Sequence, residues 1–248
     1  MDFGVILDVE TTGINAKNDQ IIEIGLLEFS VVQNQRPQIT RMYGSLQDPG
    51  IPISKEIEQL TGLSDAVVKG HVIDWAFVGS VLAKASVVIA HNAEFDRQFI
   101  EASGKIQGIA PHWACSLRHI DWRRHGYRQM GLTYLAADHG FLNPFAHRAV
   151  FDCATTFRLV APHLDELITR SYEKEFTVHA LASPFESKDV LKKRGYHWDP
   201  HMRCWVTIVP ESRLEEERNF LAEEVYKGTP KHRETLRESG VATSISAF

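Results

Sequence analysis

Residues 3–13 read Phe-Gly-Val-Ile-Leu-Asp-Val-Glu-Thr-Thr-Gly and contain both the first apolar run of the chain and its first acidic motif. The run from Phe3 to Val9 is rich in β-forming residues and predicts a strand. Successive side chains on a strand point to opposite faces, so Asp8 and Glu10 project together while Val9 packs into the core. Two carboxylates on one face repel each other, which lowers stability unless a cation lies between them. The motif therefore indicates a metal site, although a lone Asp-x-Glu pair is more often two surface acids.

Two further motifs place a carboxylate beside an apolar stretch, where a buried charge needs a partner or a metal. They read His91-Asn-Ala-Glu-Phe-Asp96 and His147-Arg-Ala-Val-Phe-Asp152. We expect Asp96 on a helix that starts near Ala93, and Asp152 within the first turns of a later helix, so that both reach the first pair of acids. Four carboxylates and one histidine are the groups that two-metal hydrolysis of a phosphodiester requires. Oxygen ligands without cysteine favour Mg²⁺ or Mn²⁺ over zinc.

The histidines of these two motifs have different expected roles. His147 precedes Asp152 at the entry from a loop to a helix, from which its ring can reach past the metal pair toward solvent. A histidine titrates near neutrality, so it can take a proton from a metal-bound water. His91 lies between a strand and a helix, and we interpret it as mainly structural, with Asn92 orienting the loop. A lone histidine before a helix is more often a satisfied polar residue than a base, but three such motifs in order are hard to produce by chance.

The order of predicted elements indicates an α/β domain with a mixed sheet, because a meander of strands is followed by strands that alternate with helices. Strands are expected at residues 3–9, 21–32, 38–45 and 86–90. Helices are expected at residues 53–60, 75–84, 93–102, 132–139 and 148–164. We expect this domain to span residues 1–172.

The remainder of the chain has a different pattern of apolar and charged residues, which predicts a small accessory α+β module over residues 177–227. Its expected elements are a strand, a short basic helix, a second strand and a charged amphipathic helix. About fifty residues are too few for a rich core, so we expect the module to be docked. Residues 228–248 are polar and are expected to form a flexible tail.

Two interpretations of this module stay open. Trp198 and Trp205 form the core of a tiny fold, or a basic group grips a phosphate backbone beside an exposed aromatic ring. The basic group consists of Lys188, Lys192, Lys193 and Arg194. His197, His201 and Cys204 have a spacing compatible with zinc, but no fourth ligand is evident, so we interpret them as turn residues.

The composition is that of a soluble globular protein, with 44% hydrophobic and 24% charged residues among 248. Three cysteines lie far apart without a Cys-x-x-Cys pair, which fits a reducing cytoplasm and argues against a disulfide framework. The N-terminus lacks a basic region before its apolar run, so we expect no signal peptide. No apolar run is long enough to cross a bilayer. We therefore expect a soluble cytoplasmic protein without a membrane partner.

The net charge of −5 is unusual for a protein that binds nucleic acid, but the distribution of charge matters more than its sum. Residues 104–140 reverse the acidic bias of the residues before them. This basic stretch contains Lys105, Arg118, Arg123, Arg124 and Arg128, interleaved with Trp113, Trp122 and Tyr127. It is either a solvated surface with a few core aromatics, or a surface that binds phosphates and stacks bases beside the metal site.

Together, the three motifs closely resemble those of the DEDD superfamily of 3′–5′ exonucleases, in the branch that uses a histidine as general base. They match the family patterns Asp-x-Glu-Thr-Thr-Gly, His-Asn-x-x-Phe-Asp and His-Arg-Ala-x-x-Asp. The resemblance implies a ribonuclease-H-like fold, with a mixed five-stranded sheet flanked by helices. It implies two ions of Mg²⁺ or Mn²⁺ and His147 as the base. The implied metal ligands are Asp8, Glu10, Asp96 and Asp152. The residues expected at the terminal nucleotide are Thr11, Thr12, Gly13, Asn92 and Phe95.

Within that superfamily, the motifs are most similar to those of the proofreading subunit of bacterial replicative polymerase and its stand-alone relatives. The resemblance implies hydrolysis at 3′ ends of single-stranded or frayed DNA, release of nucleoside monophosphates, and a polymerase or repair protein as partner. Because the metal site alone does not read the 2′-hydroxyl, trimming of RNA 3′ ends stays an alternative. Another alternative is a non-catalytic protein that binds a polymerase or clamp, although such a protein has no need for an intact catalytic set.

Overall fold

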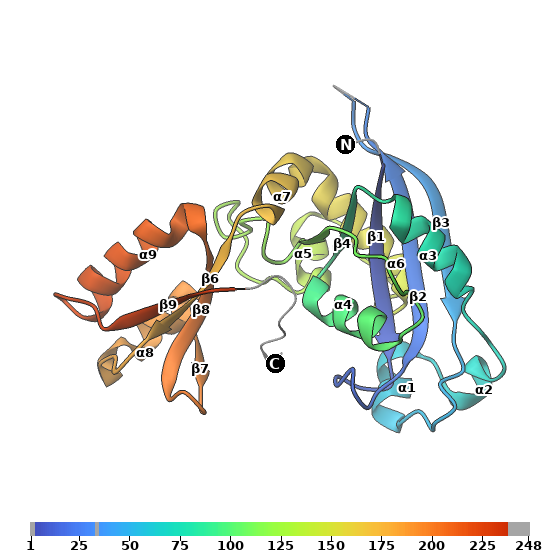
Figure 1. The fold of residues 1–248 in the computed structure, drawn as a ribbon, viewed down its shortest axis with the longest axis horizontal. Coiled ribbons are helices and arrows are strands. Elements are labelled where there is room, and N and C mark those ends of the chain that lie inside the picture. The colour runs from blue at the N-terminus through green and yellow to red at the C-terminus, as the bar shows by residue number, and fades with distance from the viewer. Residues whose placement is uncertain (1–2, 33–34, 238–248) are drawn as a thin grey trace. The chain divides into compact units, whose positions relative to one another are not determined.

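The computed structural model describes residues 3–32 and 35–237, and the chain divides after Ser171 into two compact units. The first unit is built on a five-stranded sheet with strand order β3-β2-β1-β4-β5 (Figure 1). Its strands are β1 (Phe3–Thr11), β2 (Ile21–Ser30), β3 (Gln38–Leu46), β4 (Val87–Ala90) and β5 (Trp113–Cys115). The first three strands form an antiparallel meander, whereas β4 and β5 run parallel to β1. This mixed sheet confirms the fold class predicted from the order of strands and helices.

Helices cover both faces of this sheet, which gives the first unit three layers (Figure 1). The helices of this unit are α1 (Lys55–Thr61), α2 (Asp65–Val68), α3 (Trp75–Lys84), α4 (Ala93–Ala102), α5 (Leu132–Asp138), α6 (Ala149–Val160) and α7 (Leu164–Ser171), with the 3₁₀ turn η1 (Ala161–His163) between the last two. Of these, α1 and α2 belong to neither of the two apolar clusters that cover the faces of the sheet. One apolar cluster joins the sheet to α3 and α4, and another joins its opposite face to α5, α6 and α7.

The alternation of β1 decides where its two acids lie. Leu7 and Val9 belong to the cluster beneath α3 and α4, whereas Ile6 belongs to the cluster beneath α6. Because side chains two residues apart share a face of a strand, Asp8 and Glu10 continue the Ile6 side. Both acids therefore face the N-terminal end of α6, which carries the third motif.

Glycine in β2 allows α6 to approach the sheet closely. Gly25 pairs with Asp8 in β1 and with Gly44 in β3. A Cβ atom at Gly25 would lie 2.4 Å from the carbonyl carbon of Ala149, so a larger residue cannot fit beneath the first turn of α6. This contact brings the start of α6 directly over the strand pair that carries Asp8.

The second unit contains a four-stranded antiparallel sheet with strand order β7-β8-β6-β9. Its strands are β6 (Glu175–Ala180), β7 (His197–Asp199), β8 (Cys204–Pro210) and β9 (His232–Leu236). Its helices are α8 (Lys188–Arg194) and α9 (Leu214–Phe220), with the short helical turns η2 (Phe185–Ser187), η3 (Glu211–Arg213) and η4 (Leu221–Val225). The core consists of Val178, Ala180, Leu191, Tyr196, Val209, Leu214, Leu221 and Val225. In the described part of either unit, no helix has the length and apolar character that crossing a bilayer requires.

The expectation of a polar tail over residues 228–248 does not hold for β9, which forms an edge of this sheet beside β6. The polar sequence of this segment does not predict a strand. In the structure Glu234 is not solvated but forms an ion pair of 2.7 Å with Arg218 of α9. Residues 238–248 lie outside the described part of the chain.

Neither interpretation of the accessory module holds completely. Trp198 is 49% exposed and packs edge-on against Trp205, which itself only borders the core. Arg194 is held by Glu216 at 2.8 Å and by Glu217 at 3.0 Å, so this member of the basic group stabilises the fold. Among the described residues, His197, His201 and Cys204 do not form a cluster of metal-ligating atoms.

Candidate active site

The first and third acidic motifs meet where β1 approaches the start of α6. One carboxylate oxygen from each of Asp8, Glu10 and Asp152 lies within 4.8 Å of the other two. Asp152 is buried, and the two acids of β1 are half-buried. Three carboxylate oxygens at this separation repel one another unless a cation lies between them, so the geometry fits the predicted metal site.

Asp96 joins this group because β4 is shorter than β1. The pairing of β4 with β1 ends at Ile6, which leaves the edge of β1 open beyond that residue. The backbone N–H of Val9 donates a hydrogen bond of 3.0 Å to Oδ1 of Asp96 across this edge. Asp96 is buried, so this bond fixes a fourth carboxylate on the floor of the same cleft.

The chain before α6 positions Asp152 and His147. Asn143 donates to Oδ1 of Asp152 at 2.9 Å, and the backbone N–H of Arg148 donates to Oδ2 at 3.2 Å. His147 adopts a φ of 62°, in the left-handed region that residues other than glycine rarely occupy. This conformation turns the chain into α6 and leaves the His147 ring exposed at the rim of the cleft.

A buried ion pair that the sequence analysis missed anchors the same turn. Glu23 of β2 lies opposite Glu10 in the sheet and is 4% exposed. Nε of Arg148 lies 3.1 Å and 3.2 Å from its two carboxylate oxygens, and Nη2 lies 3.0 Å from one of them. The backbone N–H of Ala149 adds a bond of 3.1 Å. An acid inside an otherwise apolar strand was the available signal, since such a charge needs a partner.

The four acids hold their protons more tightly than isolated carboxyl groups. Burial, and then the charge of Asp96, raise the pKa of Asp8 well above its usual value. Burial, and then Asp152, raise the pKa of Glu10 to about 8. Burial also raises the pKa of Asp96 to about 8, against the opposing hydrogen bond from Val9, and it raises the pKa of Asp152. Bound divalent cations would replace these protons, and an all-oxygen donor set suits Mg²⁺ or Mn²⁺.

The four acids and His147 line a cleft of about 420 Å³. Four residues expected at the substrate also line it: Thr11, Gly13, Asn92 and Phe95. Sequence reasoning missed the apolar wall, where Ile14, Leu60 and Tyr134 are 83%, 50% and 62% exposed. Large exposed apolar side chains beside a polar floor are typical of a surface that contacts a ligand.

Thr12 does not line this cleft. Its hydroxyl accepts a hydrogen bond from the backbone N–H of Gln20 at 3.0 Å and donates to Asp19 at 3.4 Å. A Cβ atom at Gly13 would lie 2.6 Å from the Asp19 carboxylate, so the glycine makes room for this closure. Thr12 and Gly13 therefore shape the turn after β1, and the expected contact of the Thr12 hydroxyl with substrate is unsupported.

His91 has the contacts of a structural residue. Its Nδ1 lies 2.8 Å from Oγ of Ser116, and its Nε2 lies 2.9 Å from the carbonyl oxygen of Met130. Burial lowers the pKa of His91 to about 4, so the ring is neutral near pH 7. These bonds join the turn before α4 to both ends of the connection that precedes α5.

The aromatic residues of the basic stretch are not arranged for stacking on bases. Trp122 is 1% exposed and belongs to the core, and Tyr127 is partly buried against it. Arg118 is paired with Glu94 at 3.2 Å. The stretch is therefore a core segment with an exposed basic surface, and the base-stacking interpretation is wrong for Trp122.

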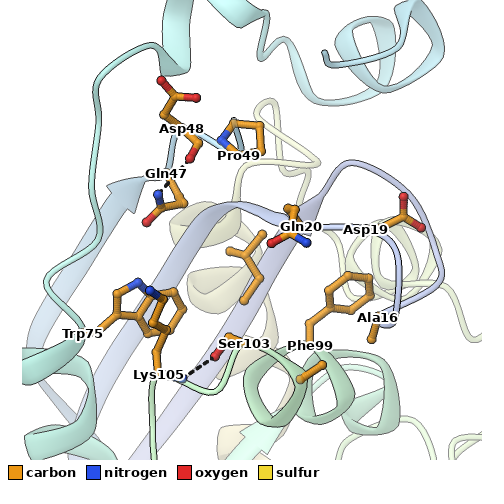
Figure 2. A pocket seen from close by; sticks show the side chains of 12 residues that line it. Ala16, Asp19, Gln20, Gln47, Asp48, Pro49, Trp75, Phe99, Ser103 and Lys105 are labelled. Atoms are coloured by element: carbon orange, nitrogen blue, oxygen red, sulfur yellow. Dashed lines mark hydrogen bonds between the residues drawn. The ribbon is translucent and has the colours of Figure 1, made fainter. Parts of the chain in front are cut away.

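A second pocket, of about 200 Å³, lies between the turn before β2, the end of β3 and the end of α4 (Figure 2). Trp75, Phe99 and Lys105 are among the side chains that line it. None of the predicted catalytic or substrate residues lines it, so the chemistry described above belongs to the larger cleft.

Comparison with known proteins gives a family and a group of relatives. A family model described as an exonuclease, RNase_T, matches residues 5–160. The DNA polymerase III PolC-type of Caldanaerobacter subterraneus is 33% identical over 202 residues, which is 78% of this chain and 14% of that protein. Its counterpart in Streptococcus thermophilus is 28% identical over 161 residues, or 63% of this chain and 11% of that protein. The chain thus spans about a seventh or less of the length of these relatives.

Solved structures share the fold at low sequence identity. One described as a full-length 3′-exonuclease has a TM-score of 0.53 and 16% identity, covering 66% of this chain and 61% of that chain. Its likeness confirms the ribonuclease-H-like fold of the first unit. Another, described as exonuclease X in complex with 5′-overhanging duplex DNA, has a TM-score of 0.48 and 22% identity, covering 68% of this chain and 93% of that chain.

Proposed function

The chain belongs to the exonuclease family whose model spans residues 5–160, and from that premise we propose that it is a metal-dependent 3′–5′ exonuclease acting on single-stranded or frayed DNA. The observation that carries this proposal is the meeting of four carboxylates from β1, α4 and α6 at one cleft. The elements that carry these four residues lie far apart in the sequence and come together only in the folded chain. The products are nucleoside monophosphates.

The metal ligands in this proposal are the four clustered acids: Asp8, Glu10, Asp96 and Asp152. Two divalent ions, when bound, lower the pKa of water and stabilise charge on the attacking and leaving oxygens. His147 is the general base, and the exposure of its ring allows the proton that it takes to pass to solvent. Arg148 and Glu23 hold the start of α6, so that His147 and the acids keep their separation.

The shape of the cleft supports a terminal, unpaired nucleotide as the substrate. A volume of about 420 Å³ lies in the range of sites that hold one small ligand, which favours a single terminal nucleotide and therefore a single-stranded or frayed end. Phe95 and the exposed apolar wall offer surfaces on which any base can stack, which favours cleavage without sequence preference. The PolC-type polymerases among the relatives support DNA as the substrate and a polymerase as a partner.

The test uses one single-stranded oligonucleotide labelled separately at each end, in matched DNA and RNA forms, with Mg²⁺. We expect the 3′ label to leave first as a mononucleotide and the 5′-labelled strand to shorten stepwise. Asp96→Asn is the informative variant, because the amide oxygen can still accept the bond from Val9 while the charge is lost. Asp165→Asn, at an exposed position of α7, is the control. First release of the 5′ label contradicts the proposed direction, and faster cleavage of RNA makes the RNA-trimming alternative correct.

A further inference from the structure

Three metal-binding side chains meet in the first unit outside the catalytic cleft. They are His125, His163 and Glu166, and one ligand atom of each lies within 4.8 Å of the other two. His125 lies in the connection between β5 and α5, whereas His163 and Glu166 are three residues apart across η1 and α7. Because residues three apart on a helical turn share a face, the pair points toward the same place.

Glu166 is held so that one of its oxygens faces His125. Its Oε1 accepts from the backbone N–H of Asp121 at 2.9 Å and from Nη1 of Arg170 at 3.2 Å. Its Oε2 lies 2.8 Å from Nε2 of His125. Carboxylates that bind metals are commonly fixed in this way by hydrogen bonds to the oxygen that does not ligate.

His163 supplies a second imidazole without a competing hydrogen bond. Its ring centroid lies 4.3 Å from that of His125, and among the described residues none forms a hydrogen bond with its ring nitrogens. A ring nitrogen of His163 lies among the ligand atoms of the cluster, all within 4.8 Å of one another, so it can point a lone pair at a shared ion. The side chains of His125 and Glu166 are 33% and 29% exposed, which leaves an ion a way in from solvent.

We propose that His125, His163 and Glu166 form a binding site for a zinc-type transition-metal ion, distinct from the carboxylate cleft. Two imidazole nitrogens and one carboxylate oxygen are a ligand set that zinc accepts, with a water in the fourth position. Imidazole suits Zn²⁺, Co²⁺, Ni²⁺ and Cu²⁺, whereas the all-oxygen cleft suits Mg²⁺ and Mn²⁺. In the metal-free protein the His125–Glu166 hydrogen bond takes the place of the ion.

A bound ion at this site joins the connection before α5 to α7. Gly131, at the end of that connection, lines the catalytic cleft, and His91 holds the same connection through Met130. The expected role is therefore structural: the ion fixes the segment that carries one wall of the cleft. The site does not depend on the proposed nuclease activity, and its test is independent of turnover.

The experiment titrates the full chain with Zn²⁺ by calorimetry and with Co²⁺ by visible absorption, with Mg²⁺ in large excess to occupy the carboxylates. We expect one Zn²⁺ per chain and the absorption bands of Co²⁺ in a low-symmetry site with nitrogen ligands. His163→Ala and Glu166→Gln should each weaken Zn²⁺ binding by at least about tenfold, because even the outer contacts of a metal ligand contribute that much.

His139→Ala is the matched control. His139 lies against Trp122, as His163 does, but its Nδ1 is bonded to the carbonyl oxygen of Leu135 and it is not in the cluster. It should leave Zn²⁺ affinity unchanged. Melting temperatures measured without zinc identify any variant that fails to fold. If His163→Ala does not fold, the Zn²⁺ affinity of Glu166→Gln, which keeps the size of the side chain, tests the proposal. The proposal is wrong if the wild type binds no Zn²⁺ under these conditions, or if Glu166→Gln binds it as tightly as the wild type.

Discussion

Gly25→Ala adds a single methyl group at the point where α6 rests on the sheet. The new Cβ would lie 2.4 Å from the carbonyl carbon of Ala149, and 2.6 Å from both the oxygen of that carbonyl and the backbone nitrogen of Val150. Carbon atoms in contact lie about 3.5 Å apart or more, so the first turn of α6 must move by about 1 Å. The neighbours are backbone atoms, which cannot rotate away as a side chain can.

This displacement falls on the metal site. Gly25 is paired with Asp8, and the turn that must move carries Asp152 and follows His147. A displacement of about 1 Å at reacting groups can lower turnover by about 100-fold. Overpacking of this kind also lowers the free energy of unfolding by about 1–3 kcal/mol. Turnover of a single-stranded oligonucleotide with Mg²⁺ and the melting temperature measure the two effects separately.

Gly44→Ala is the matched control, because it is the next glycine across the same sheet. Its Cβ would lie 3.3 Å from the Cβ of Val150, so the neighbouring atoms need to shift by only a few tenths of an ångström. We expect Gly44→Ala to keep most of its turnover while Gly25→Ala loses nearly all of it. Equal turnover in the two variants would refute the argument that Gly25 sets the distance between Asp8 and Asp152.

Three further predictions concern the same cleft. Glu23→Gln removes the charge that holds Arg148 and should lower turnover more than it lowers substrate affinity. Separate measurements of kcat and KM test this, and an effect confined to KM contradicts a positioning role for Glu23. Without metal, Glu10 and Asp96 have pKa values of about 8 in the folded protein and about 4 in the unfolded chain. Between about pH 4 and about pH 8, the folded state therefore binds more protons than the unfolded state. Stability of the metal-free protein should therefore fall as pH rises from about 4 to about 8, whereas a melting temperature in EDTA that rises over this range contradicts the assignment. His147→Ala should lower turnover by about 10²–10⁴-fold while keeping affinity for single-stranded DNA, and a near-normal rate across pH 6–9 rules out His147 as the base.

The parts of the fold that the sequence predicts are those set by local periodicity. Alternation along β1 correctly separates Val9 from Asp8 and Glu10, because side-chain direction in a strand depends only on position. The helix that carries Asp152 begins at Ala149, within one residue of the predicted start, because its apolar residues recur with the period of a helix. The hydrogen bond from Val9 to Asp96 has no such signal, since it depends on how far β4 extends beside β1.

The parts that escape prediction depend on contacts that the periodicity of the sequence does not encode. Gly25 reads as an ordinary strand glycine until Ala149 is placed above it. The sequence predicts that Thr12 contacts the substrate because its hydroxyl follows the acidic motif, yet the hydroxyl closes a turn with Asp19 and Gln20. Ala149 lies far from Gly25 in the chain, whereas Asp19 and Gln20 lie within the same turn as Thr12, but the alternation of apolar and polar residues predicts neither contact.

The metal dependence of turnover in the wild type and in Asp8→Asn tests the role of the clustered carboxylates. We predict no release of mononucleotides in EDTA, and release on addition of Mg²⁺ or Mn²⁺. The turnover of Asp8→Asn should be about a thousandfold or more below that of the wild type, although the variant remains folded. Metal ions stabilise the transition state by several kcal/mol, and each 1.4 kcal/mol corresponds to about a tenfold change in rate. Turnover that persists in EDTA, or that survives in folded Asp8→Asn, would contradict the claim that these carboxylates hold the catalytic metals.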